Sequence, residues 1–141
     1  MPNLLPKSSK ADFKRLCDRI FQQDANVRFA GVIGEMGRLE AGGMRKGVSP
    51  LEEGKDAQRV YLDFALRSAM RHDFDPVFGR VLYAFSERER IKFASFPLTE
   101  NNILLVSIEK GKPHNKTIGK VLKLINEQRL DSPQNEIRVE K

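Results

Sequence analysis

Five of the ten glycines lie in one stretch, RFAGVIGEMGRLEAGG, from Arg28 to Gly43. This stretch constrains the fold more than any other. Its first half is short, β-branched and aromatic without a helical period, and a second such segment follows within a few residues that include Gly37. Two segments of this kind predict a β-hairpin, with Gly37 at a turn position that needs a positive φ. Gly42 and Gly43 lack side chains within the second segment and predict a bulge or the close approach of another element.

A phosphate-binding loop is the alternative for so many glycines. It needs Gly-x-Gly-x-x-Gly, or a Gly-Lys-Ser/Thr ending, where a strand passes into a helix. Gly31, Gly34 and Gly37 are instead spaced by three, and a strand follows rather than a helix. The sequence therefore favours the hairpin.

Helical periodicity is found before this hairpin and again near the end of the chain. Ser8 or Ser9 can cap a first helix that ends at 24–26. Its apolar stripe includes Cys17, which we interpret as a small buried hydrophobe rather than a nucleophile. A closing helix carries a second narrow stripe, and His114 precedes it as a candidate cap. The first stripe consists of Phe13, Leu16, Cys17, Ile20 and Phe21, and the second of Ile118, Val121, Leu122 and Ile125.

A third helix, expected from Lys55 to His72, is apolar over roughly two-thirds of its circumference at 100° per residue. A helix that covers a sheet needs an apolar arc of only about 100°. We therefore expect burial on two sides, against the sheet and against either another part of the chain or a partner. The face expected on the sheet holds Ala57, Val60, Tyr61, Phe64, Ala65 and Ser68, and the extension of the arc holds Leu62, Leu66, Ala69 and Met70.

Three strands are predicted at 80–86, 90–98 and 102–109. The order helix, two strands, helix, three strands, helix predicts an α+β fold with one antiparallel sheet. A chain of 141 residues fits one domain, which we place at 9–127 between a flexible N-terminus (1–8) and a polar C-terminal tail (128–141).

Catalytic and metal-binding patterns are missing from the sequence. We interpret His72, Asp73 and Asp75 as a solvated helix end rather than a metal site, and we expect no cofactor and no enzyme activity. A single cysteine excludes an internal disulfide framework and is consistent with the cytoplasm. The longest unbroken apolar run, 103–106, is too short to span a membrane.

The formal net charge is +6, but basic and acidic residues alternate along the whole chain. Only 88–92 forms a basic cluster, where Arg88, Arg90 and Lys92 are candidate anion contacts. A charged hairpin tip is more often simply solvated, and we do not favour nucleic-acid binding.

The element order and the hairpin FAGVIGEMGRLEAGG resemble the roadblock/dynein-light-chain family, a profilin-like fold, and are similar to uncharacterised archaeal proteins of that type. The resemblance implies a five-stranded sheet of order 2-1-5-4-3 between helix layers. It also implies homodimers formed by the central helix and the third strand, and members that act as scaffolds or regulators of small GTPases without an active site. The implied dimer interface holds Leu62, Leu66, Met70, Val81, Tyr83 and Phe85.

The first hypothesis for function is therefore a non-enzymatic, homodimeric interaction module with a regulatory or scaffolding role. The second is a small-molecule sensor of GAF/PAS-like layout, with a ligand between sheet and central helix. The third is nucleic-acid binding through the basic hairpin. Room for a ligand would come from Ala30, Ala41, Gly42 and Gly43, although small residues equally permit close helix packing.

Overall fold

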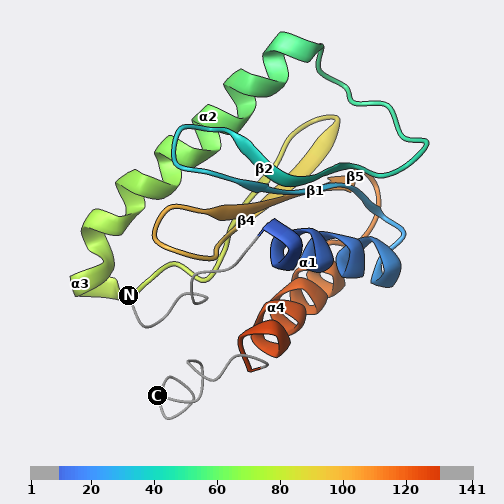
Figure 1. Ribbon diagram of the computed structural model, residues 1–141. Helices are drawn as coiled ribbons and strands as arrows, with labels where there is room; N and C mark the ends of the chain where they lie inside the picture. The colour runs from blue at the N-terminus through green and yellow to red at the C-terminus, as the bar shows by residue number, and fades with distance from the viewer. Residues whose placement is uncertain (1–9, 131–141) are drawn as a thin grey trace.

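The computed structural model describes residues 10–130 and contains one sheet of five antiparallel strands. The expected Ser8 or Ser9 cap, the N-terminus 1–8 and the tail from 131 onward lie outside the described residues. The strand order β2-β1-β5-β4-β3 confirms the expected sheet (Figure 1). The strands are β1 (Val27–Ile33), β2 (Leu39–Met44), β3 (Ala84–Glu87), β4 (Ile91–Pro97) and β5 (Ile103–Glu109).

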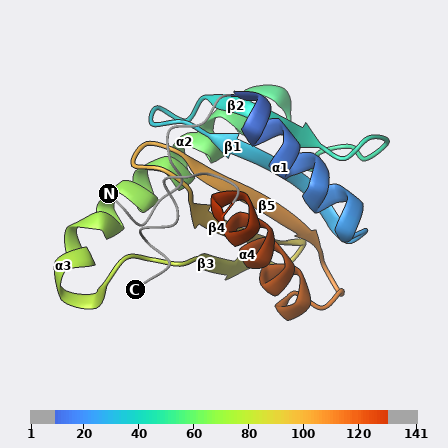
Figure 2. The ribbon, with the colours of Figure 1, turned by 60° about the horizontal axis from the view of Figure 1, so that its bottom comes forward.

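Helices cover both faces of this sheet. On one face, α1 (Lys10–Gln23) and α4 (Asn115–Leu130) lie side by side, as Figure 2 shows. On the other face, α2 (Gly54–Arg71) is the only long helix among the described residues (Figure 1). A 3-10 turn, η1 (His72–Phe74), and one turn of helix, α3 (Asp75–Phe78), continue α2 at its C-terminal end.

The larger hydrophobic core fills the layer between the sheet and α1/α4. Leu104, Val106 and Ile108 on the central strand β5 alternate toward this side and are fully buried. The stripes expected on α1 and α4 face them, because amphipathic helices bury their apolar side against a sheet. The described part of α4 ends at Leu130, so this helix runs past the expected domain end at 127.

The β1–β2 hairpin forms as expected, with Gly37 in the turn at φ 80°. Gly42 adopts φ 83°, and a Cβ there would collide with the Ala30 carbonyl and lie 2.8 Å from Cys17 Sγ. The small residues therefore let α1 approach the sheet closely. Ala30 and Ala41 pack in the same core, so for these two residues and Gly42 the structure favours close helix packing over a cavity toward α2.

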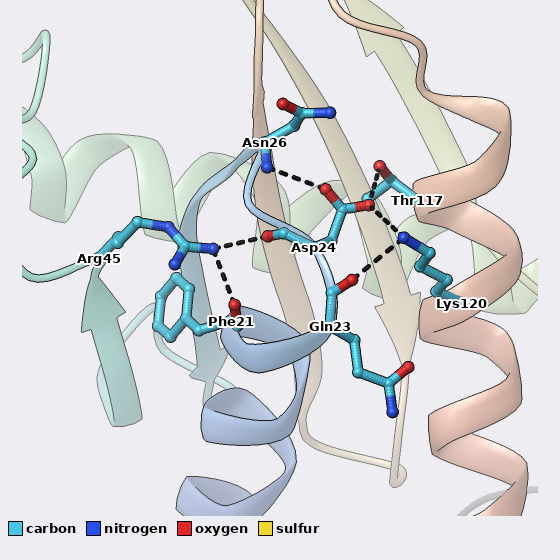
Figure 3. A network of polar contacts seen from close by, with 7 residues as sticks. All are labelled: Phe21, Gln23, Asp24, Asn26, Arg45, Thr117 and Lys120. Atoms are coloured by element: carbon cyan, nitrogen blue, oxygen red, sulfur yellow. Dashed lines mark hydrogen bonds and ion pairs between the residues drawn. The ribbon is translucent and has the colours of Figure 1, made fainter.

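A buried carboxylate ties α1 to α4 (Figure 3). Asp24 accepts hydrogen bonds from Thr117 Oγ1 (2.6 Å) and from the backbone N–H of Asn26 (2.9 Å), and its carboxylate lies 3.7 Å from Lys120 Nζ. Arg45, which follows β2, donates to the Asp24 carbonyl (2.6 Å). This network joins the ends of α1 and β2 to α4 at one corner of the molecule.

The third strand is shorter than expected, because 80–83 connect α3 to the sheet without pairing. Pairing begins with Ala84 opposite Ser95, and an extension of β3 in this register would place Leu82 opposite Pro97. Proline has no N–H to donate to a ladder. The expected start at residue 80 is therefore wrong, and the alternating apolar side chains of 80–83 belong to a connection.

Candidate protein-interaction surface

Only a narrow strip of α2 is buried against the sheet. Tyr61 and Ala65 are its buried residues, and the Tyr61 ring lies 5.7 Å from the Phe29 ring. Phe64 makes a second ring contact, 5.1 Å from Phe93. These contacts fix one side of the helix and confirm the predicted sheet-facing side, while the rest of the wide apolar arc extends beyond them.

The outer part of that arc is exposed. Leu62, Leu66 and Met70 follow each other at intervals of four residues, so they lie along one side of the helix. Their exposed fractions rise from 37% through 53% to 68% toward the C-terminal end. Phe74 in η1 continues the series and is also exposed. We call these four residues the α2 apolar line.

A groove of about 840 Å³ lies beside this line, between α2 and the strands β3 and β4. Leu62 and Leu66 reach it from α2, and the small residues Ala84, Ser86 and Ser95 line its sheet side. Charged side chains surround the apolar part. They are Asp56, Arg59, Asp63, Arg67, Arg71 and Arg88.

The opposite side of α2 is closed by the β1–β2 turn. A Cβ at Gly37 would lie 2.7 Å from Leu62 Cα and 2.8 Å from Leu62 N. Another polypeptide can therefore reach the middle of α2 only from the outside or from the β3 side.

The structure brings together three of the six residues implied as a dimer interface. Leu62, Leu66 and Met70 share the α2 apolar line, but Val81 and Tyr83 lie in the connection before β3, and the Tyr83 ring is 6.1 Å from Phe96. Phe85 packs against the α1/α4 core. The side chain of Phe85 thus lies on the face of the sheet away from α2.

His114 covers this Phe85 side chain. Its ring stacks on Phe85 with centroids 4.3 Å apart, and its carbonyl accepts the Ile118 N–H at the start of α4 (2.9 Å). The residue before the closing helix thus caps it through its backbone, while its side chain secures the edge strand.

The candidate anion contacts are also separated. Arg88 and Arg90 are exposed at the β3–β4 turn, whereas Lys92 is 6% exposed. Lys92 donates to the Lys112 carbonyl (2.6 Å), and its Nζ lies 3.1 Å from His114 Nδ1. Lys92 therefore forms its polar contacts within the fold and does not join the two arginines in a surface site.

No group of three histidine, cysteine, aspartate or glutamate residues within 10–130 could hold a metal ion. His72 Nδ1 instead lies 3.0 Å from Asp75 Oδ2 at the end of α2. Burial raises the pKa of the Cys17 thiol to about 12, which keeps it protonated and unreactive near neutral pH. In the same part of the chain, no helix combines the length and apolarity needed to cross a bilayer.

The sequence patterns did not predict three exposed apolar residues: Phe74, Val77 and Phe78. Val77 is 75% and Phe78 80% exposed. One sequence signal could have located α3, which holds Val77 and Phe78, because Asp75–Pro76 places an acidic residue and a proline at its start. Nothing in the local sequence shows that the side chains of this single turn point away from the sheet.

A five-stranded antiparallel sheet of this order, between α1/α4 and α2, is the roadblock/LC7 fold. The structure is similar to the gliding protein MglB from Thermus thermophilus (TM-score 0.64, 14% identity, 94% of this chain and 99% of that one). It is also similar to the Roadblock/LC7 domain from Streptomyces avermitilis (0.62, 12%, 84% and 95%) and to MglB with a tetrameric arrangement (0.58, 14%, 91% and 98%). At these identities the likeness shows the fold.

The chain belongs to the family described as Family of unknown function (DUF6659), whose model matches residues 5–128. No curated protein matches the sequence.

Proposed function

We propose that this protein is a non-enzymatic, homodimeric module with a regulatory or scaffolding role in the cytoplasm. The observation that carries the proposal is the exposed α2 apolar line beside an open groove. Leu66 is half-exposed at the middle of a helix, and Leu62 and Met70 extend it on both sides. Contiguous exposed apolar surface of this kind marks an interaction site.

The sheet offers a second element to the same interface. β3 lies at the edge of the sheet and pairs only with β4 among the described strands. An edge strand has backbone N–H and C=O groups free to pair with another chain. A second copy could therefore contact both α2 and β3, which agrees with the homodimer that the roadblock resemblance implies.

A small GTPase is the partner we propose for the dimer, on the basis of that resemblance. The direct test uses the small GTPases encoded in the same genome, each loaded with GDP or a GTP analogue. We expect one of them to bind with an affinity that depends on the nucleotide. Failure of all of them to bind in either state would contradict this choice of partner.

The homodimer itself is tested with Leu66→Glu. Leu66 is already 53% exposed, so a carboxylate there is expected to leave the monomer folded but to place buried charges in the interface. Leu51→Glu is the matched control, because Leu51 is similarly exposed (56%) but lies before α2. Sedimentation should give a monomer for Leu66→Glu and a dimer for Leu51→Glu. A dimeric Leu66→Glu protein would contradict the proposed interface.

A small-molecule sensor is the second candidate, and the volume of the groove favours it. A volume of about 840 Å³ falls within the range of ligand pockets, roughly 300–1,000 Å³. Native mass spectrometry of the purified protein would reveal a retained ligand.

Nucleic-acid binding gains less support, because Glu87 and Glu89 alternate with the two arginines at the turn.

A further inference from the structure

The net positive charge of the chain is concentrated in one stretch, residues 110–126. It contains five lysines and no acidic residue. The rest of the chain has 20 basic and 19 acidic residues, so this stretch accounts for nearly all of the net charge of +6. Because one to three other residues separate successive lysines, the stretch does not stand out as a basic cluster in the sequence.

The helix α4 brings three of these lysines to one side. Lys116, Lys120 and Lys123 have the i, i+4, i+7 spacing of one helix face, and all three are exposed. They follow one another over about 10 Å along the helix axis. Lys112 is exposed in the turn just before α4. We call these four residues the α4 lysine face.

The fold leaves most of the charge on the α4 lysine face without a counter-charge. Among the described residues, Lys112, Lys116 and Lys123 have no ion-pair partner. Lys120 is the exception, because its Nζ lies 3.7 Å from the carboxylate of the buried Asp24 (Figure 3). At least three of the four ammonium groups are therefore free to attract an anion from outside the chain.

The neighbouring helix α1 has the opposite arrangement. Lys14 Nζ lies 3.0 Å from the Asp18 carboxylate on the same helix. Arg19 lies 2.8 Å from Glu127, the acidic residue that follows the lysines on α4. That carboxylate is therefore already paired with α1. In the layer formed by α1 and α4, the positive charge that lacks a partner lies on α4 (Figure 2).

These lysines lower the stability of α4 rather than raise it. Lys116 is the second residue of the helix, where the partial positive charge of the helix dipole disfavours a cation. Lys116 and Lys120 also form a like-charge pair at i, i+4, which is unfavourable. The folding of the chain therefore does not explain why its positive charge is gathered here.

We propose that the α4 lysine face binds the anionic headgroups of a lipid bilayer, without insertion of apolar side chains. No large apolar side chain between 110 and 128 is exposed, and lysine is depleted at protein interfaces, so a protein partner fits less well. The stretch also lacks arginine, phenylalanine, tyrosine and tryptophan, which hold nucleic acids by bidentate phosphate contacts and by stacking. A cluster of four lysines on a helix is typical of surfaces attracted to anionic lipid.

This surface does not compete with the proposed homodimer and does not depend on it. The α4 lysine face belongs to the α1/α4 layer, whereas the α2 apolar line lies on the other side of the sheet (Figure 2). A bilayer and a second copy can therefore be bound at the same time. The lysines would hold the regulatory module at the membrane while α2 stays accessible.

Co-sedimentation of the full chain with lipid vesicles tests the proposal. One set of vesicles is phosphatidylcholine alone, and the other has two parts phosphatidylcholine to one part phosphatidylglycerol. The variant Lys116→Gln/Lys123→Gln removes two charges from the face at exposed positions. Arg38→Gln/Lys55→Gln is the matched control, because it lowers the net charge equally at exposed positions away from α4. Circular dichroism confirms that both variants are folded.

The wild type is expected to bind the anionic vesicles at low salt, to be released at high salt, and not to bind phosphatidylcholine. Each lysine near an anionic leaflet strengthens binding about five-fold, so Lys116→Gln/Lys123→Gln should bind about 25-fold more weakly. The control should stay close to the wild type. Equal losses in both variants, or no binding of the wild type at low salt, would overturn the proposal. Preference for a DNA duplex over anionic vesicles at equal phosphate concentration would overturn the choice of lipid.

Discussion

Gly37 in the β1–β2 turn lies directly against the backbone of Leu62 in α2, where an added Cβ would sit 2.7 Å from the Leu62 Cα. Two elements far apart in the sequence thus meet with no side chain between their backbones. The contact holds the middle of α2 next to the hairpin and leaves its other flank open toward β3. The position of the proposed interface therefore depends on a glycine that lies outside it.

Gly37→Ala is expected to destabilise the fold more than Gly47→Ala. Both glycines have a similar positive φ, 80° and 83°, which costs an alanine about 1–2 kcal/mol. Of the two, only Gly37 has a neighbour within 4 Å, so only Gly37→Ala must also displace Leu62. Urea unfolding should show an additional loss of at least about 1 kcal/mol for Gly37→Ala. Equal losses for both variants would show that α2 does not depend on this contact.

Asp24→Ala is expected to lower the free energy of unfolding by about 2–4 kcal/mol. It leaves the buried Thr117 hydroxyl without its acceptor and removes the nearby carboxylate from Lys120. Asp18→Ala is the control, because Asp18 is exposed and its ion pair is with the exposed Lys14. Thermal or urea unfolding should show a loss below about 1 kcal/mol for that variant. Similar losses at both positions would contradict a structural role for the Asp24 network.

Stability is expected to fall in alkaline solution because of Cys17. Burial raises its pKa from 9.0 to about 12, so the unfolded thiol loses its proton first as the pH rises. The contribution of the buried, protonated thiol to the free energy of unfolding is complete below about pH 9. It declines by about 1.4 kcal/mol per pH unit between pH 9 and 12. Unfolding of the wild type and Cys17→Ala at pH 8 and pH 10 tests this. The wild type should lose about 1.4 kcal/mol more than the variant, and equal losses would contradict the assignment.

Periodicity along the sequence was enough to predict the helices that cover the sheet, and the resemblance supplied the order of its strands. The stripe through Leu16 and Ile20 recurs with the helical period, and the missing side chain at Gly42 marks the close approach of α1. The start of β3 could not be predicted from the local alternation of residues, because it depends on pairing with the neighbouring strand β4. There, Pro97 on β4 ends the pairing before Leu82 can join it.

The candidate site was predictable along the helix but not across the sheet. The excess apolar arc located Leu66 and Met70 on the surface of α2. The alternation in β3 did not show which face Phe85 occupies, because that depends on the register with Ala94 and on the His114 ring. The sequence suggested that Lys92 belongs to a surface basic cluster. In the structure its ammonium group donates a hydrogen bond to the carbonyl of Lys112, twenty residues later in the chain.

The molar mass of the wild-type protein in solution is the most direct test of the central claim. Light scattering would be recorded across a dilution series at low and high salt. The account expects a dimer that persists in high salt, because apolar burial at Leu62, Leu66 and Met70 is not screened by ions as charge pairs are. A monomer at every concentration would contradict the homodimer and leave the α2–β3 groove open as a ligand site.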